Sequence, residues 1–468
     1  MRARVGRRLR TAPFRPVAMV ATTLVVGLVA ACGTTVTGHP TASTTVAVRT
    51  VDPVFVRGTD GGTADRLAAT VLTDLQGYWR QTYPRVFGRP WQDVAGGVYS
   101  VDSGDAAAKP PPCADRAAEV QGNAFYCPAA DAIAWDRAAL LPVLRERFGD
   151  AGVVLVLAHE MGHAVQHRAG LSIEELRDHP DRYPMILVET MADCYAGAVV
   201  RWVTDGHAPD LRMGPRDLDA ALSTLVTFRD PVGTTASDMA SHGDAFDRVG
   251  AFQDGYQRGP DLCAGMTVQN RRFTQQEVTE PGARTNGGNL PLDQLLAAMG
   301  PDLAGYFGGV VAGLGRRWAP PRVQPTGAEP GCGGDQGPAA FCPAQGAIDV
   351  DIAGAVPRLH RQIGDYAVGT LVASRFGLAA LAAVGRPVDG EDAGRGAVCL
   401  AGAYTGTLLA RRNGFALSPG DLDKAVELLL GYDFAARDVH GHPVPTGYQR
   451  VAAFRAGFQG GARSCGLG

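Results

Sequence analysis

Lysine is almost absent from this chain of 468 residues, in which only Lys109 and Lys424 occur. Arginine supplies nearly all of the basic side chains, a bias that suits a GC-rich coding sequence better than a binding role. The formal net charge is −3 at pH 7, so the composition indicates no strongly basic surface of the kind that binds nucleic acids. A hydrophobic content of 46% suits globular cores, and the length allows two or more domains.

The N-terminus lacks a hydrophobic run long enough for a comfortable transmembrane helix. Residues 17–31 form an apolar stretch of 15 residues behind a basic segment, whereas a spanning helix needs about 20 residues. Such a pattern is typical of an export signal. The stretch ends in Val29-Ala30-Ala31-Cys32, which resembles a bacterial lipobox, so we expect Cys32 to become a lipidated first residue. A simple cleaved signal and a short anchor are the alternatives.

Loss of residues 1–31 would change the net charge of the protein and leave a tether at its N-terminus. Residues 1–31 contain six arginines and no acidic residue, so their removal takes the net charge from −3 to about −9 and disfavours nucleic acid as a partner. Residues 33–50 are rich in threonine and lack aromatic residues, which predicts a flexible tether. We therefore expect a lipid-anchored protein of the bacterial cell envelope, outside the cytoplasm.

The pentapeptide His159-Glu160-Met161-Gly162-His163 follows the apolar residues 152–158. On a helix, positions i and i+4 share one face, so the two imidazoles can bind one zinc ion. Glu160 stands beside them, where it can take a proton from a metal-bound water. Because an HExxH sequence also occurs by chance, the prediction of a metal site depends on a third ligand.

The residues just after the pentapeptide do not supply that ligand. His167 continues the i+4 series, but it lies about 12 Å along the helix axis from His159, too far for zinc bonds of about 2 Å. The longer HExxHxxGxxH pattern fails, because Gln166 stands at its glycine and Ala169 at its third histidine. The sequence therefore argues against the metzincin class.

A pair of acidic residues further on is a better candidate. Glu189 and Asp193 are four residues apart within an apolar stretch, so their carboxylates share one helical face. Buried acids without partners would be costly. Glu189 can close the zinc shell, and Asp193 can accept the second N–H of a ligand histidine. The alternative is a solvated acidic face.

Several motifs in order resemble the bacterial neutral zinc metallopeptidase family, over roughly residues 65–265. They are Gly122-Asn-Ala-Phe-Tyr-Cys127-Pro128, Ala132-Ile-Ala-Trp-Asp136, HEMGHAVQ from His159, ETMADCYAG from Glu189, and His242-Gly243 followed by Arg248. The resemblance implies a gluzincin-like site with one Zn²⁺ per chain, bound by His159, His163 and Glu189, with Glu160 as the base and a peptide or protein as substrate. ETMAD stands where the family more often has ELQAD, which leaves the ligand and the aspartate unaffected.

The second half of the chain repeats the first without its chemistry. Residues 359–385 align with residues 144–170 at a constant offset of 215, with glycine and apolar positions kept. The site positions are lost: His159 corresponds to Ser374, Glu160 to Arg375, His163 to Leu378, Glu189 to Gly394 and Asp193 to Val398. We expect a metal site in the first half only, and a degenerate second half packed against it as a pseudo-dimer.

The repeat also predicts how the cysteines pair. If Cys32 carries lipid, eight cysteines remain, an even number that suits an oxidising compartment. Each half carries four of them in the same order. The simplest pairing is Cys113–Cys127, Cys194–Cys263, Cys332–Cys342 and Cys399–Cys465.

The predicted fold class is α+β and helix-rich, with tandem duplicated zincin-like domains. Helices are expected at 65–84, 138–148, 151–168, 186–204 and 215–228, and strands at 98–101 and 132–135, the second lining the site as an edge strand. The expected organisation is a lipoprotein signal peptide at 1–31, a tether at 32–60, a metallopeptidase domain at 61–270, a linker at 271–290 and a degenerate repeat at 291–468.

The predicted activity is zinc-assisted hydrolysis of peptide bonds, with Glu160 as proton acceptor. His242, in a polar loop that looks like a recurrent family element, is the candidate donor to the tetrahedral oxyanion. One alternative is a catalytically silent, lipid-anchored binding or scaffold protein with a residual zinc site. Another is a pseudopeptidase whose second half blocks the cleft. The sequence leaves the substrate and the oligomeric state open.

Overall fold

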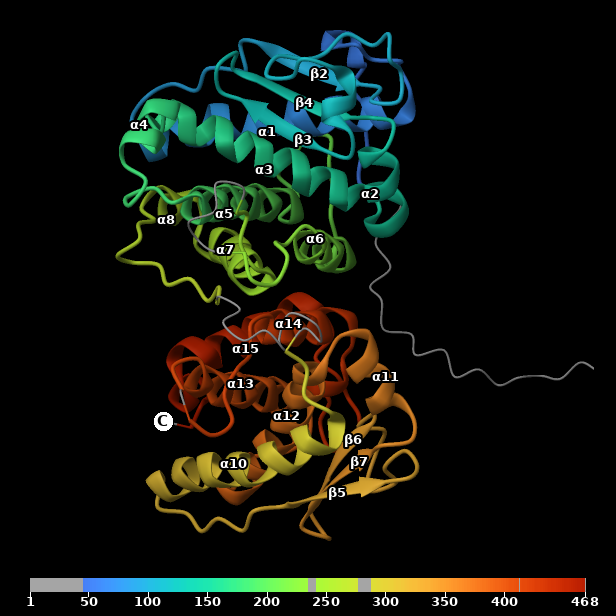
Figure 1. Ribbon diagram of the computed structural model, residues 1–468, viewed down its shortest axis with the longest axis vertical. Helices are drawn as coiled ribbons and strands as arrows, with labels where there is room; N and C mark the ends of the chain where they lie inside the picture. Colours follow the sequence, from blue (N-terminus) through green and yellow to red (C-terminus); the bar gives the residue numbers. More distant parts are fainter. Residues whose placement is uncertain (1–44, 235–240, 277–287, 412, 468) are drawn as a thin grey trace, which may run out of the picture. The chain divides into compact units, whose positions relative to one another are not determined.

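The computed structural model describes residues 45–234, 241–276, 288–411 and 413–467 (Figure 1). The expected signal peptide, the lipidation site Cys32, the first part of the tether and residues 277–287 of the expected linker lie outside these ranges. The described part is rich in helices and has two small mixed sheets. This confirms the predicted helix-rich α+β class.

The elements fall into two groups that follow the same order along the chain. The first group is η1 (Pro53–Phe55), β1 (Val56–Arg57), α1 (Thr63–Phe87), β2 (Gly97–Val101), η2 (Ala117–Val120), β3 (Ala124–Cys127), β4 (Ala132–Asp136), α2 (Leu140–Phe148), α3 (Asp150–Ala169), α4 (Ile173–Asp178), α5 (Met185–Thr204), α6 (Pro215–Thr227), α7 (Ala245–Arg258) and α8 (Pro260–Ala264). The second is α10 (Leu292–Gly313), β5 (Arg322–Thr326), β6 (Ala339–Cys342), β7 (Ala347–Asp351), α11 (Ala355–Gln362), α12 (Asp365–Ala383), α13 (Glu391–Leu408), α14 (Asp421–Gly431), η3 (Phe434–Ala436), α15 (Gly447–Gly460) and η4 (Ala462–Cys465).

In the first group, the sheet has the strand order β1-β2-β4-β3. β4 pairs in parallel with β2 and antiparallel with β3, so β4 lies inside the sheet and β3 forms the edge next to α3. The expectation that residues 132–135 form an edge strand is therefore wrong. All five residues of β4 are buried, as suits an inner strand covered on both faces.

Two almost entirely buried helices form the centre of the first group. α3 lies between the sheet and α5, and α7 packs on α5 (Figure 1). α3 is apolar around most of its circumference, as in residues 151–158, and so is α5 in residues 196–200. A helix that is apolar on all sides is stable only where other elements surround it. The polar side chains of these two helices are consequently held within the core.

The second group shares the strand register of the first. Its sheet has the order β5-β7-β6. β3 and β4 pair Cys127 with Ala132, and β6 and β7 pair Cys342 with Ala347, each 215 positions later. α12 occupies the corresponding place beside β6 and α13. By length and composition α10 and α12 could each cross a membrane, but the apolar window of α12 is 89% buried, so α12 serves as a core helix.

Disulfides tie the same places in both groups. They join β3 and β6 to the loops before them, and α5 and α13 to the segments after α7 and α15. The four bonds are Cys113–Cys127, Cys194–Cys263, Cys332–Cys342 and Cys399–Cys465, which are the pairs that the internal repeat predicts.

The folded unit begins before residue 61. Val46 and Val56 are buried, the backbone N–H of Val48 donates to the carbonyl of Asp210 at 2.8 Å, and β1 pairs with β2. The last part of the expected tether is thus held against the first group, because its valines bury apolar surface there.

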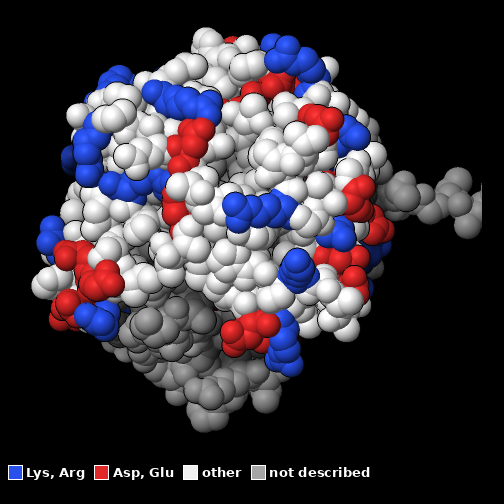
Figure 2. Space-filling view, turned by 90° about the horizontal axis from the view of Figure 1, so that it is seen from above, with Lys and Arg blue, Asp and Glu red and all other residues white. Residues whose placement is uncertain are grey.

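Charged side chains of both signs occur near one another on the face seen in Figure 2, among uncharged residues. The described surface also carries ion pairs between exposed residues, such as Arg85 with Asp261 and Arg201 with Asp205. Exposed pairs of this kind contribute little to stability, about 0–1 kcal/mol each.

Candidate metal centre

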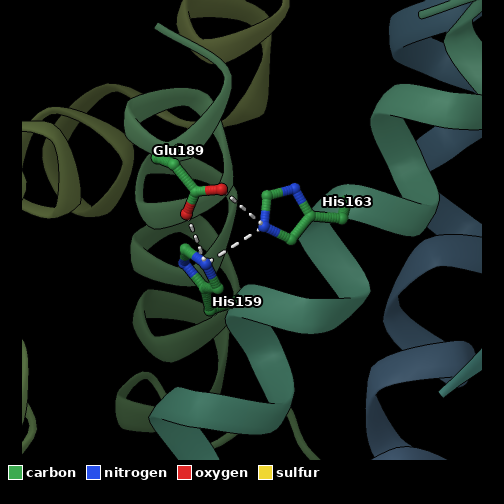
Figure 3. Close-up of side chains that lie close together, drawn as sticks. All are labelled: His159, His163 and Glu189. Atoms are coloured by element: carbon green, nitrogen blue, oxygen red, sulfur yellow. Dashed lines mark hydrogen bonds and ion pairs between the residues drawn. The ribbon is translucent and has the colours of Figure 1, made fainter. Parts of the chain in front are cut away.

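Two neighbouring helices bring three side chains with metal-binding atoms together. His159 and His163 project from α3 and Glu189 from α5, and all three point toward one another (Figure 3). The Nε2 atoms of His159 and His163 lie 3.1 Å apart. Glu189 Oε2 lies 3.1 Å from the Nε2 atom of His159, and its Oε1 lies 3.5 Å from that of His163.

These separations fit a single tetrahedral zinc ion. Bonds of about 2.0–2.1 Å at tetrahedral angles place neighbouring ligand atoms about 3.3 Å apart. Two imidazoles and one carboxylate form a donor set of catalytic zinc sites, which keep a fourth position open. The other group of potential ligands among the described residues, Cys332, Cys342 and Asp349, contains a disulfide and offers no thiolate.

Both histidines have their other ring nitrogen bound to an oxygen. His159 Nδ1 lies 2.8 Å from Asp193 Oδ1, and His163 Nδ1 lies 2.9 Å from Gln166 Oε1. Gln166 Nε2 donates to the carbonyl of Val188 at 2.6 Å, which turns its amide oxygen toward His163. Because both oxygens accept, each Nδ1 donates a proton, so Nε2 is the ring nitrogen that binds a metal once it has lost its own proton.

Asp193 is held by a second cation, Arg248 of α7. Arg248 donates from Nε to Oδ2 at 2.8 Å and from Nη2 to Oδ1 at 3.0 Å, and from Nη1 to the carbonyl of Phe228 at 2.7 Å. Burial would raise the pKa of Asp193, but Arg248 and His159 lower it. Burial would lower the pKa of His159, but the carboxylates of Asp193 and Glu189 raise it to about 10. The carboxylates of Asp193 and Glu189 therefore stabilise a positive charge at His159.

Gly162 allows the two ligand helices to approach closely. A Cβ atom at this position would lie 2.9 Å from both Cα and O of Ala192 on α5. Contacts of this length with backbone atoms are not tolerated without movement of one helix. The glycine within the HExxH sequence thus sets the spacing that brings Glu189 to the histidines.

Glu160 lies beside the ligands, where it can act on a substrate. Its side chain lines the same cavity, and its Oε2 accepts a hydrogen bond from the backbone N–H of Tyr126 on β3 at 2.9 Å. Burial raises the pKa of Glu160, although His159 and His163 act to lower it. A raised pKa suits a group that takes and returns a proton near neutral pH.

His242 also lines the cavity, with its side chain 52% exposed. Its Nδ1 lies 3.5 Å from Asp230 Oδ1, and the backbone N–H groups of His242 and Gly243 donate to Asp230 at 2.9 Å and 2.8 Å. Burial would raise the pKa of Asp230, but these bonds lower it to about 2. The ionised Asp230 in turn raises the pKa of His242.

The cavity has a volume of about 450 Å³, within the usual range of ligand sites. Its polar part contains the three ligand side chains, Glu160 and His242. Its walls are largely apolar and include Phe125, Leu155, Val156, Leu171, Ile173, Leu176 and Phe228. All lining residues fall between Gly122 and Arg248, so no described residue of the second group lines the cavity.

The structure brings together every residue that the sequence analysis assigned to the site. It also places three further residues, Gln166, Arg248 and Asp230, in contact with them. His167 lies apart from the ligands and bonds through Nδ1 to the Tyr126 hydroxyl at 2.8 Å. Sequence reasoning missed the roles of Gln166, Arg248 and Asp230. For Gln166 a signal existed, because position i+3 from His163 lies on the same helical face.

A profile of the family described as "Putative neutral zinc metallopeptidase" matches residues 16–265, more than half of the 468-residue chain. The matched range contains every residue of the candidate metal centre and of its cavity. No curated protein and no solved structure matches the chain.

Proposed function

Because the chain belongs to the neutral zinc metallopeptidase family, we propose that it hydrolyses peptide bonds with one zinc ion held by His159, His163 and Glu189. The observation that carries this proposal is the convergence of two Nε2 atoms and a carboxylate at separations of 3.1–3.5 Å. When bound, zinc would polarise the scissile carbonyl and lower the pKa of a water molecule at the site toward neutrality.

Glu160 is the proposed base. Its carboxylate lies in the cavity beside the ligand side chains, and burial raises its pKa. It accepts the proton of the attacking water and later gives that proton to the leaving amine. The N–H of Tyr126 holds one of its oxygens, which leaves the other for the reacting atoms.

His242 is the proposed donor to the oxyanion of the tetrahedral intermediate. Asp230 keeps the imidazole oriented and favours its protonated form, since the two groups lie 3.5 Å apart and Asp230 is ionised. A positioned cationic donor stabilises negative charge that develops only in the transition state.

The cavity walls favour peptides with apolar side chains near the cleaved bond. Ile173 and Phe228 line the cavity yet remain 49% and 39% exposed, so their apolar surfaces are open to a substrate. Covering such surface contributes about 25 cal/mol per Å². The absence of second-group residues from the described lining weighs against a second half that blocks the cleft.

We also propose that the chain is exported and anchored by lipid at Cys32, in the cell envelope. Four disulfides support an oxidising compartment. The second half is proposed to be a duplicated copy that lost its site. The shared strand register at an offset of 215 and the repeated disulfides support this proposal.

The metal content of the purified mature protein tests the proposal. Mass spectrometry should find one zinc per chain in the wild type and none in His163→Ala or Glu189→Ala, because two remaining ligands bind zinc weakly. His167→Ala is the matched control: it removes a histidine one turn further along α3 that bonds to the Tyr126 hydroxyl and is not one of the three ligands, and should keep its zinc.

Hydrolysis of a fluorogenic peptide library then separates an enzyme from a binding protein. Glu160→Gln should keep zinc and lose activity by about a hundredfold or more, the scale of general base catalysis. Zinc that survives His163→Ala and Glu189→Ala would overturn the ligand set. Zinc without any Glu160-dependent hydrolysis would favour a silent binding protein instead.

A further inference from the structure

The second half of the chain contacts the first half at two places next to residues of the site. At the first, Asp423 of α14 accepts a hydrogen bond from the backbone N–H of Phe246, in the first turn of α7, at 3.3 Å. At the second, Arg229 pairs with Asp423 at 3.3 Å and with Glu427 at 2.6 Å. Asp423 is only 4% exposed, so little solvent competes for these bonds.

The contacted residues, Arg229 and Phe246, are close in sequence to residues of the site. Arg229 lies between Phe228, whose carbonyl receives a hydrogen bond from Arg248, and Asp230, which binds His242. Phe246 lies two residues before Arg248, which holds Asp193 and through it His159. Contacts from the second half therefore fix the backbone on both sides of the groups that orient His159 and His242.

The first half makes the same contact in return. Asp219 of α6 accepts hydrogen bonds from the backbone N–H groups of Gly447 and Tyr448, at the start of α15, both at 2.7 Å. Asp219 and Asp423 occupy the same position of an Asp-Leu-Asp sequence, at 217–219 and 421–423. Each half thus accepts hydrogen bonds from the first amides of a helix of the other with the equivalent residue, the pattern of an isologous interface.

Of these two contacts, only the one between Asp423 and α7 adjoins the candidate metal centre. α15 carries Arg450 where α7 carries Arg248, and Arg450 donates to the carbonyls of Leu429 and Val444. The position of Asp193 is taken by Val398 in the second half, so no carboxylate orients a histidine there. The two contacts have the same geometry, but only the contact of Asp423 with α7 adjoins residues of the candidate site.

We infer that the second half is a built-in partner subunit, and that Asp423 and Glu427 position Asp230, His242 and Arg248 for the reaction of the first half. Its catalytic readout rests on the proposed peptidase function, whereas its structural readout does not. Asp423 is a positioning residue, since it touches neither ligand nor substrate.

Paired substitutions in the full chain test this inference. Asp423→Ala and Asp219→Ala remove equivalent acceptors of similar burial, 4% and 6% exposed, and Arg229→Gln removes a partly exposed partner without disturbing a core. Hydrogen exchange should quicken by about fivefold or more at the first amides of α7 in Asp423→Ala, the scale expected when an acceptor of helix N-terminal amides is lost. In Asp219→Ala the quickening should appear at Gly447 and Tyr448 instead.

Activity should follow the same asymmetry. We expect kcat/KM to fall by about tenfold in Asp423→Ala and less in Arg229→Gln, mostly through kcat, because misplaced catalytic groups slow the chemical step. Asp219→Ala should stay within about twofold of the wild type. Unchanged exchange at α7 in Asp423→Ala, or an equal loss of activity in Asp219→Ala, would overturn the inference. An inactive wild type would refute the peptidase proposal and leave the exchange result to decide this one.

Discussion

At the scale of single residues, the candidate metal centre depends on side chains that offer no ligand atom. Asp193 and Gln166 each accept a hydrogen bond from a histidine Nδ1, and so turn both Nε2 atoms toward Glu189. Arg248 and His159 together keep Asp193 ionised, since their charges and hydrogen bonds outweigh the burial that would raise the pKa of this carboxyl. The ligand geometry is therefore prepared by the fold before a metal binds.

Asp230→Asn is predicted to move the alkaline limb of the pH profile of kcat/KM to lower pH. Asp230 has a pKa of about 2 and stays ionised at neutral pH; it raises the pKa of His242. A raised pKa keeps the imidazole protonated to higher pH, so loss of the negative charge must bring its deprotonation down. Rates measured from pH 5 to 10 check this, with His242→Gln as the reference that lacks the limb. An unmoved limb would show that His242 does not control it.

The sequence predicts the residues of the site unevenly, and the reason is distance along the chain. His159, His163, Glu189 and Asp193 stand at helical spacings within two apolar stretches, which local periodicity can read. Arg248 meets Asp193 across 55 positions, and no periodic pattern connects them. Such contacts follow from the packing of α7 on α5, which the sequence does not encode locally.

At the scale of elements, the close contact of α3 with α5 joins ligands from two helices. Gly162→Ala is predicted to lower zinc affinity, because the new Cβ would lie 2.9 Å from backbone atoms of Ala192 and push the helices apart. Overpacking of this kind costs about 1–3 kcal/mol. Competition with a chromogenic chelator measures the affinity.

Gly152→Ala is the matched control for that substitution. It adds the same methyl group to the same helix, but its nearest contacts, Phe148 Cβ at 3.1 Å and Thr224 Oγ1 at 3.3 Å, are longer and require smaller shifts than the contacts of 2.9 Å at Gly162. Zinc affinity should stay close to that of the wild type. Equal effects of the two substitutions would mean that the stability of α3, and not its spacing from α5, governs metal binding.

The bounds of the helices and strands were more predictable than the way in which these elements pair and pack. The expected helices and strands occur near their predicted bounds, because long apolar patterns identify them. The expectation that β4 is the edge strand lining the site was wrong: β3 takes the edge, and the backbone N–H of its Tyr126 donates to Glu160. Strand order depends on pairing between distant segments, which burial of one strand alone does not determine.

At the scale of the whole molecule, the second half shares strand register with the first, and other side chains stand at the positions that align with the site. Arg375 aligns with Glu160 and is fully buried. Gln336 accepts a hydrogen bond from Phe341 N–H on the edge strand β6 at 3.0 Å. At Gly394, the place of Glu189, a Cβ would lie 2.2 Å from the carbonyl oxygen of Ala436. No side chain can project there toward a metal.

Arg375→Met is therefore predicted to destabilise the chain while leaving its zinc content unchanged. Arg375 donates to Gln336 Oε1 at 3.2 Å and to the carbonyls of Arg437 and Phe434 at 3.1 Å and 2.8 Å. Leaving buried acceptors unpaired costs about 1–3 kcal/mol, which should lower the apparent unfolding temperature. Arg395→Met, at an arginine 48% exposed, should change that temperature little. A lower zinc content in Arg375→Met would mean that this filled site still controls the metal of the first half.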